Sequence, residues 1–202
     1  MTSATSKIVR DILIVVDTRE QLPYTFPRTV SRALQAGDYS IDGLEDRVAV
    51  ERKSLPDLFG SVGKGRDRFR REWERLAKME RAAVVIEASL SDVRCSPPAY
   101  SAMHPRAVVQ TLIAWSVRYD VHVVFAGSRR FGQAYTGFFL AHFYNHIYCP
   151  WRTAGIGGSH RPELADQPPV NTPNAAPSAS QFQAGPPGVV KFRGPCGPHP
   201  RE

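Results

Sequence analysis

Residues 37–57 read GDYSIDGLEDRVAVERKSLPD, two apolar stretches separated by a turn. Asp38 begins the first stretch, and Glu51 and Lys53 end the second. The dipeptide Asp42-Gly43 between them favours a tight hairpin turn. The segment therefore predicts two antiparallel strands, at about residues 38–41 and 47–53.

Three charged groups of this hairpin suit metal-assisted phosphodiester chemistry. Glu51 and Lys53 are two residues apart, so on a strand both side chains leave the same face, and Asp38 lies on the neighbouring strand. Hard divalent cations prefer carboxylate oxygens, and phosphodiester cleavage uses a metal-activated water beside a positive group. A Glu-x-Lys pair alone is common on solvated strands, so the functional interpretation depends on the sequence around it.

An apolar run upstream adds further charges. Residues 12–16 are Ile-Leu-Ile-Val-Val, which is typical of a buried strand, and we expect that strand to cover residues 8–17. Asp17, Arg19 and Glu20 follow at its end, where strands often present functional groups.

The order of these pieces resembles the nuclease domain of the XPF family of structure-specific DNA endonucleases. The resemblance covers residues 8–146 and rests on Val16-Asp17-x-Arg19-Glu20, Gly37-Asp38-Tyr39, Val50-Glu51-Arg52-Lys53-x3-Asp57, Leu58-x-Gly60-Ser61 and Gly65-Arg66. It implies a restriction-endonuclease-like α/β core that cuts DNA near junctions of double-stranded and single-stranded regions. It also implies Mg²⁺ as the cofactor, with Mn²⁺ as a substitute.

The resemblance assigns roles by position. It implies that Asp17, Asp38 and Glu51 are metal ligands and that Lys53 orients the attacking water. The implied supporting residues are Arg19, Glu20, Arg52 and Asp57.

The chain departs from the family after Cys149. Archaeal and eukaryotic members follow the nuclease domain with a tandem helix-hairpin-helix domain, which the remaining residues could not build. The chain is therefore similar to the short stand-alone versions of bacteria and phages. Besides DNA, we expect as partner either a second copy of the chain or another protein.

Composition divides the 202 residues into one domain and a tail. The hydrophobic content of 42% is sufficient for a core in the first three quarters. Residues 150–202 hold 11 of the 17 prolines and 7 of the 15 glycines. We predict a flexible N-terminus at residues 1–7, a nuclease domain at 8–148 and a disordered, Pro/Gly-rich tail at 149–202.

We expect a cytoplasmic protein, with association with the nucleoid as an alternative. No run of about 18 apolar residues marks a membrane span. The N-terminal residues also lack the apolar core of a signal peptide.

The remaining elements alternate between strands and helices. We predict a strand at 29–34, a short helix capped by Ser54, a helix at 66–80, a strand at 82–87, a helix at 105–119, a strand at 121–125 and a helix at 128–148. This alternation predicts an α/β fold with a mixed central sheet flanked by helices on both faces.

A net charge of +7 and a pI of about 9.6 favour a polyanionic partner. Eight basic residues against four acidic ones lie between residues 64 and 81. Lys64, Arg66 and Arg70 are our candidates for DNA binding, because nearby glycines let the backbone approach a phosphate. The alternative is a solvated helix face with ion pairs.

The sequence thus favours a Mg²⁺-dependent endodeoxyribonuclease acting in DNA repair or recombination. One alternative is a nuclease with another preference, such as single-stranded DNA or a specific sequence. A second alternative is a non-catalytic DNA-binding or scaffolding subunit of a repair complex. The presence of all the expected acids favours the enzyme.

Overall fold

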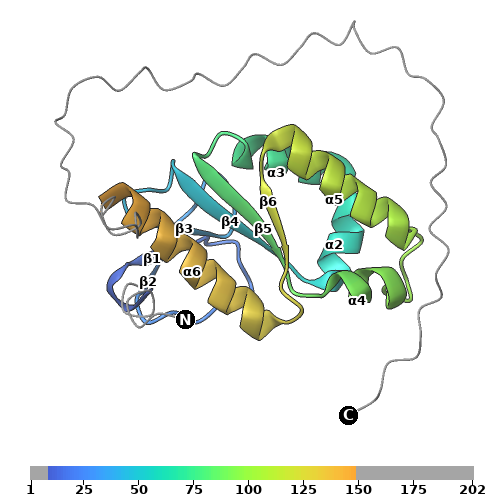
Figure 1. Cartoon of the computed structure of the whole chain (residues 1–202), viewed down its shortest axis with the longest axis horizontal. Helices are drawn as coiled ribbons and strands as arrows, with labels where there is room; N and C mark the ends of the chain where they lie inside the picture. Colours follow the sequence, from blue (N-terminus) through green and yellow to red (C-terminus); the bar gives the residue numbers. More distant parts are fainter. Residues whose placement is uncertain (1–8, 149–202) are drawn as a thin grey trace, which may run out of the picture. The chain divides into compact units, whose positions relative to one another are not determined.

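The structure is a computed structural model that describes residues 9–148 (Figure 1). The predicted flexible N-terminus at residues 1–7 and the predicted disordered tail at 149–202 lie outside the described residues. No helix among the described residues is both long enough and apolar enough to cross a membrane.

Strands and helices alternate along this part of the chain. The strands are β1 (Ile14–Val16), β2 (Thr29–Ser31), β3 (Tyr39–Ile41), β4 (Val48–Lys53), β5 (Arg81–Ile86) and β6 (His122–Phe125). The helices are α2 (Leu55–Val62), α3 (Arg66–Leu76), α4 (Leu90–Cys95), α5 (Pro105–Tyr119) and α6 (Arg129–Tyr148).

Within residues 9–148 the six strands form one sheet in the order β2-β1-β3-β4-β5-β6. Strand β3 is antiparallel to both β1 and β4, whereas the pairs β1–β2, β4–β5 and β5–β6 are parallel. The predicted mixed sheet is therefore confirmed.

Each face of the sheet packs against helices, as Figure 1 shows. On one face, Ala49 of β4 and Val84 of β5 share a buried cluster with residues of α2, α3 and α5. On the other face, Val48 and Val50 share a second cluster with residues of α6. Neighbouring residues of β4 thus serve opposite layers, because side chains alternate along a strand.

Local sequence explains how β3, β4 and α2 are connected. Gly37 has φ of +71°, and a Cβ at this position would lie 2.9 Å from the Val50 carbonyl oxygen, so only glycine fits before Asp38. At the other end of β4, the Ser54 side chain accepts a hydrogen bond from the Asp57 backbone N–H and caps α2.

Three of the predicted boundaries were wrong. The strand expected at residues 8–17 is confined to Ile14–Val16, and residues 9–11 are helical. The strand expected at 29–34 ends at Ser31, because the chain then turns towards Gly37. The helix expected at 66–80 ends at Leu76, before the turn that leads into β5.

Candidate active site

The four predicted catalytic residues line one pocket. Asp17, Asp38, Glu51 and Lys53 border a cavity of about 260 Å³. The other residues that line it are Arg19, Gly37, Ser61, Arg68, Phe69, Glu72 and Arg75. The pocket therefore lies between the sheet and helices α2 and α3.

Backbone pairing brings the three carboxylates together. The Asp17 N–H donates to the Asp38 carbonyl at 2.9 Å, and the Asp38 N–H donates to the Val50 carbonyl at 2.8 Å. Asp17 thus follows β1, Asp38 precedes β3 and Glu51 lies near the end of β4. Glu51 and Lys53 share the face of β4 that carries Ala49, as strand alternation predicts.

Asp17 has both carboxylate oxygens occupied. Its Oδ1 accepts hydrogen bonds from the Arg19 backbone N–H and from Arg19 Nε, each at 2.7 Å. Its Oδ2 accepts from Arg19 Nη2 at 2.8 Å and from the Leu34 backbone N–H at 2.7 Å. Burial raises the pKa of Asp17, but these hydrogen bonds outweigh it, so the pKa lies below its usual value.

Asp38 and Glu51 are under the opposite electrostatic influence. Burial and the nearby charge of Glu51 raise the pKa of Asp38 to about 8, although Asp38 Oδ2 accepts the Arg52 N–H at 2.7 Å. Burial also raises the pKa of Glu51, despite the adjacent Lys53. The positive charge of Lys53 therefore does not offset the burial of these two carboxylates and their repulsion.

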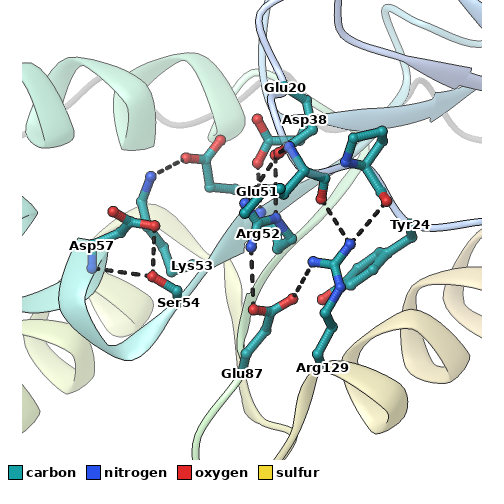
Figure 2. Close-up of polar contacts among 12 residues, drawn as sticks. Glu20, Tyr24, Asp38, Glu51, Arg52, Lys53, Ser54, Asp57, Glu87 and Arg129 are labelled. Atoms are coloured by element: carbon teal, nitrogen blue, oxygen red, sulfur yellow. Dashed lines mark hydrogen bonds and ion pairs between the residues drawn. The ribbon is translucent and has the colours of Figure 1, made fainter.

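Lys53 is held over Glu51 (Figure 2). Its Nζ donates to Glu51 Oε1 at 2.5 Å and lies 5.2 Å from the centre of the Phe69 ring. Burial lowers the pKa of Lys53, but the charge of Glu51 outweighs this effect and the pKa is raised. Lys53 consequently stays protonated at neutral pH.

Two of the predicted supporting residues, Arg52 and Glu20, form an ion pair on the face of β4 that is opposite to Glu51 and Lys53. Arg52 Nη2 donates to Glu20 Oε1 at 3.0 Å, and Arg52 Nη1 donates to Glu87 Oε2 at 3.1 Å. Arg129 Nη1 then donates to Glu87 Oε1 at 3.1 Å, and Arg129 Nη2 binds the carbonyls of residues 22 and 23. Figure 2 shows this alternating chain of charges, which links the ends of β4 and β5 to the start of α6.

Four other predicted residues do not line the pocket. Asp57 lies in the first turn of α2, where Ser54 Oγ donates to it at 2.6 Å. Lys64 is exposed in the turn before α3. Arg66 lies over the Trp115 ring at 5.0 Å, and Arg70 pairs with Glu74 at 3.7 Å. Their DNA-binding or supporting roles stay predictions.

Sequence reasoning missed three charged residues of α3 that line the pocket. Arg68, Glu72 and Arg75 are spaced i, i+4 and i+7 and so share one side of the helix. Each directly precedes one of the buried residues Phe69, Trp73 and Leu76. The apolar stripe of α3 could therefore have located them.

The carboxylates can hold a divalent cation as a pair. Among residues 9–148 no three acidic, histidine or cysteine side chains are grouped so that they could hold one ion. Mg²⁺ is commonly held by one or two carboxylates plus water and substrate phosphate oxygens, so Asp38 and Glu51 are the candidate protein ligands.

Comparison with known proteins gives a family match and similar solved structures. Residues 16–137 match the family described as the ERCC4 domain. Among solved structures, XPF from Aeropyrum pernix is similar at 21% identity with a TM-score of 0.51, covering 70% of this chain and 69% of that chain. The structure described as XPF from Aeropyrum pernix in complex with DNA has the same identity and TM-score, covering 67% and 66%. A search of curated proteins finds no match.

Proposed function

The chain belongs to the ERCC4 domain family and is an XPF-type nuclease domain, and from this premise we propose that it is a metal-dependent DNA endonuclease. The observation that carries the proposal is that the partly buried Asp38 and the buried Glu51 line one cavity, with Lys53 bonded to Glu51. The similar fold of a protein described in complex with DNA, and the net charge of +7, support a nucleic acid as the substrate.

Asp38 and Glu51 are the residues that would hold the metal. Mg²⁺ suits their oxygen donors, and Mn²⁺ would substitute. When bound, the metal supplies an activated water and offsets the charge that develops on the phosphate. Because metal ligands bind in their deprotonated form, a cation at Asp38 would compete with its proton, and its binding would weaken as the pH falls.

Lys53 and Asp17 have separate tasks in this proposal. Lys53 stays protonated in the cavity and orients the attacking water, while its contact with Glu51 fixes its position. Asp17 already accepts hydrogen bonds at both oxygens, so it holds Arg19 and the backbone at Leu34 around the site. This differs from the role of metal ligand that the resemblance implies for Asp17.

We infer branched DNA, at junctions of double-stranded and single-stranded regions, as the preferred substrate in repair or recombination. The support for this preference is the motif resemblance. Purified protein should be incubated with flap, single-stranded and duplex DNA in Mg²⁺, in Mn²⁺ and in chelator. We expect cutting of the flap with either metal and none in chelator, whereas DNA binding with no cutting in any metal would favour the scaffolding subunit.

A further inference from the structure

Helix α3 forms the wall of the pocket that faces the carboxylates. Phe69, Trp73 and Leu76 are buried and fix the orientation of the helix against the core. Glu72 adds a second anchor, because its Oε1 accepts the Gly37 backbone N–H at 3.0 Å. Side chains that share the side of Glu72 are therefore held beside the hairpin that carries Asp38 and Glu51.

Four cations line this pocket, and three of them are already engaged by a carboxylate. Arg19 pairs with Asp17, Lys53 pairs with Glu51, and Arg75 pairs with Glu72. The fourth cation is Arg68, which is exposed to solvent. Within residues 9–148 the Arg68 side chain makes no hydrogen bond, ion pair or cation–π contact.

Among the neighbouring basic residues of α3, Arg71 is exposed and does not line the pocket, whereas Arg66 and Arg70 have partners. Arg66 donates to Thr111 Oγ1 at 3.2 Å and covers Trp115, and Arg70 lies between Asp67 and Glu74. Each has a structural partner, and neither lines the pocket. Arg68 is thus the cation of this helix that both borders the cavity and is free to bind an anion.

We propose that Arg68 binds a phosphate of the DNA strand that is cut, beside the phosphate that reacts. The proposal rests on the proposed nuclease function and adds a substrate contact to it. A guanidinium offers several N–H donors in a planar fork that matches phosphate oxygens. A strand that places one phosphate at Asp38 and Glu51 would present the next to the α3 wall.

A free guanidinium also suits the charge balance of the cavity. The acids that line it are Asp17, Asp38, Glu51 and Glu72. Asp17 and Glu72 have their own arginines, whereas Asp38 and Glu51 share Lys53 and would be balanced by a metal. Arg68 is consequently the positive charge of the pocket that no acid balances, and it is the group that attracts the polyanion.

The test compares Arg68→Ala and Arg68→Lys with the wild type. Lys78→Ala is the matched control, because this change removes one charge just beyond the same helix at a residue that does not line the pocket. Affinity for a flap DNA is measured in chelator over a range of salt, and single-turnover cutting is measured in Mg²⁺ at several DNA concentrations. Thermal unfolding confirms that each variant is folded.

Loss of one phosphate contact should flatten the slope of log K against log salt by about 0.9, so the affinity gained for each tenfold fall in salt becomes about 8-fold smaller. For Arg68→Ala we expect this slope change and a higher DNA concentration at half-maximal cutting. The maximal rate should change much less. Arg68→Lys should restore most of the slope, because it keeps the charge, and Lys78→Ala should match the wild type in cutting.

The outcomes separate two failures. If the wild type cuts DNA in Mg²⁺ and Arg68→Ala has the same slope and the same half-maximal DNA concentration, the Arg68 contact is disproved while the nuclease stands. An equal slope change in Lys78→Ala would also disprove the Arg68 contact, because the slope would then depend on the net charge of the protein and not on the position of Arg68. If the wild type does not cut DNA with any metal, the proposed function itself fails.

Discussion

Three of the four acids that line the pocket, Asp17, Asp38 and Glu51, differ in their surroundings. Asp17 accepts four hydrogen bonds, whereas the partly buried Asp38 and the buried Glu51 have one lysine between them. The opposite directions in which their pKa values move follow from this difference. The two kinds of acid should therefore respond oppositely to removal of their charge.

Asp38→Asn should stabilise the metal-free protein at pH 8. The pKa of Asp38 is about 8 in the folded protein and 3.8 as its ordinary value, so between these pH values the folded state holds a proton that the unfolded state has lost. The free energy of unfolding should therefore fall as pH rises from about 4 to 8, by at most about 1.4 kcal/mol for each pH unit. Denaturant unfolding in chelator at pH 5 and pH 8 measures this, and a wild-type stability that rises over this range would contradict it.

Asp17→Asn should destabilise the protein by about 1–3 kcal/mol at pH 7, because an amide cannot accept all the bonds from Arg19 and Leu34. The lowered pKa of Asp17 means that its stabilisation is present above the ordinary pKa and is lost as pH falls through the lower folded value. The same unfolding experiment checks this variant, and its stability should be reduced with or without Mg²⁺. An unchanged stability together with a loss of Mg²⁺ binding would instead identify Asp17 as a metal ligand.

At the scale of elements, β4 serves both faces of the sheet. Glu51 and Lys53 point to the pocket, and Arg52 between them points to α6 and joins Glu20 and Glu87. Strand alternation made the first pair predictable. The partners of Arg52 could not be predicted, because Glu20, Glu87 and Arg129 are separated in sequence and meet only when β1, β5 and α6 are in place.

Helix boundaries were predictable from the sequence where neighbouring residues determine them, and not where they depend on distant parts of the chain. The cap at Ser54 and the hairpin after Gly37 depend on neighbouring residues, and they were predicted. Helix α4 was missed, although Ser89 and Asp92 form a capping box that is visible in the sequence. The end of α3 at Leu76 depends on the approach to β5 and has no comparable local signal.

Glu87→Ala should destabilise the protein by about 3 kcal/mol, because it leaves Arg52, with 9% of its side chain exposed, with one carboxylate fewer. Glu80→Ala is the matched control. Its ion pair with Arg47 is more exposed, 39% for both side chains, and should be worth less than about 1 kcal/mol. Urea unfolding measures both variants, and equal losses would show that the charge chain across β4, β5 and α6 does not link these elements.

At the scale of the whole molecule, the sequence motifs and the family match indicate the same family. Residues 16–137 match the ERCC4 domain, within the 8–148 predicted from the sequence. The mixed sheet and its two helical layers followed from the alternation of elements. The contribution of α3 to the pocket wall could not be predicted from this alternation, because it depends on how the helix is rotated against the sheet.

The most direct test of the active site is single-turnover cutting of flap DNA in Mg²⁺ by wild type, Glu51→Gln and Lys53→Met, with Mg²⁺ binding followed by calorimetry. Removing one well-placed electrostatic group commonly costs about 10²- to 10³-fold in rate, so both variants should lose most cutting. Glu51→Gln should also weaken Mg²⁺ binding, whereas Lys53→Met keeps both carboxylates and should bind Mg²⁺. DNA binding should survive in each. Cutting by both variants at the wild-type rate would contradict the assignment of Asp38, Glu51 and Lys53 as the catalytic centre.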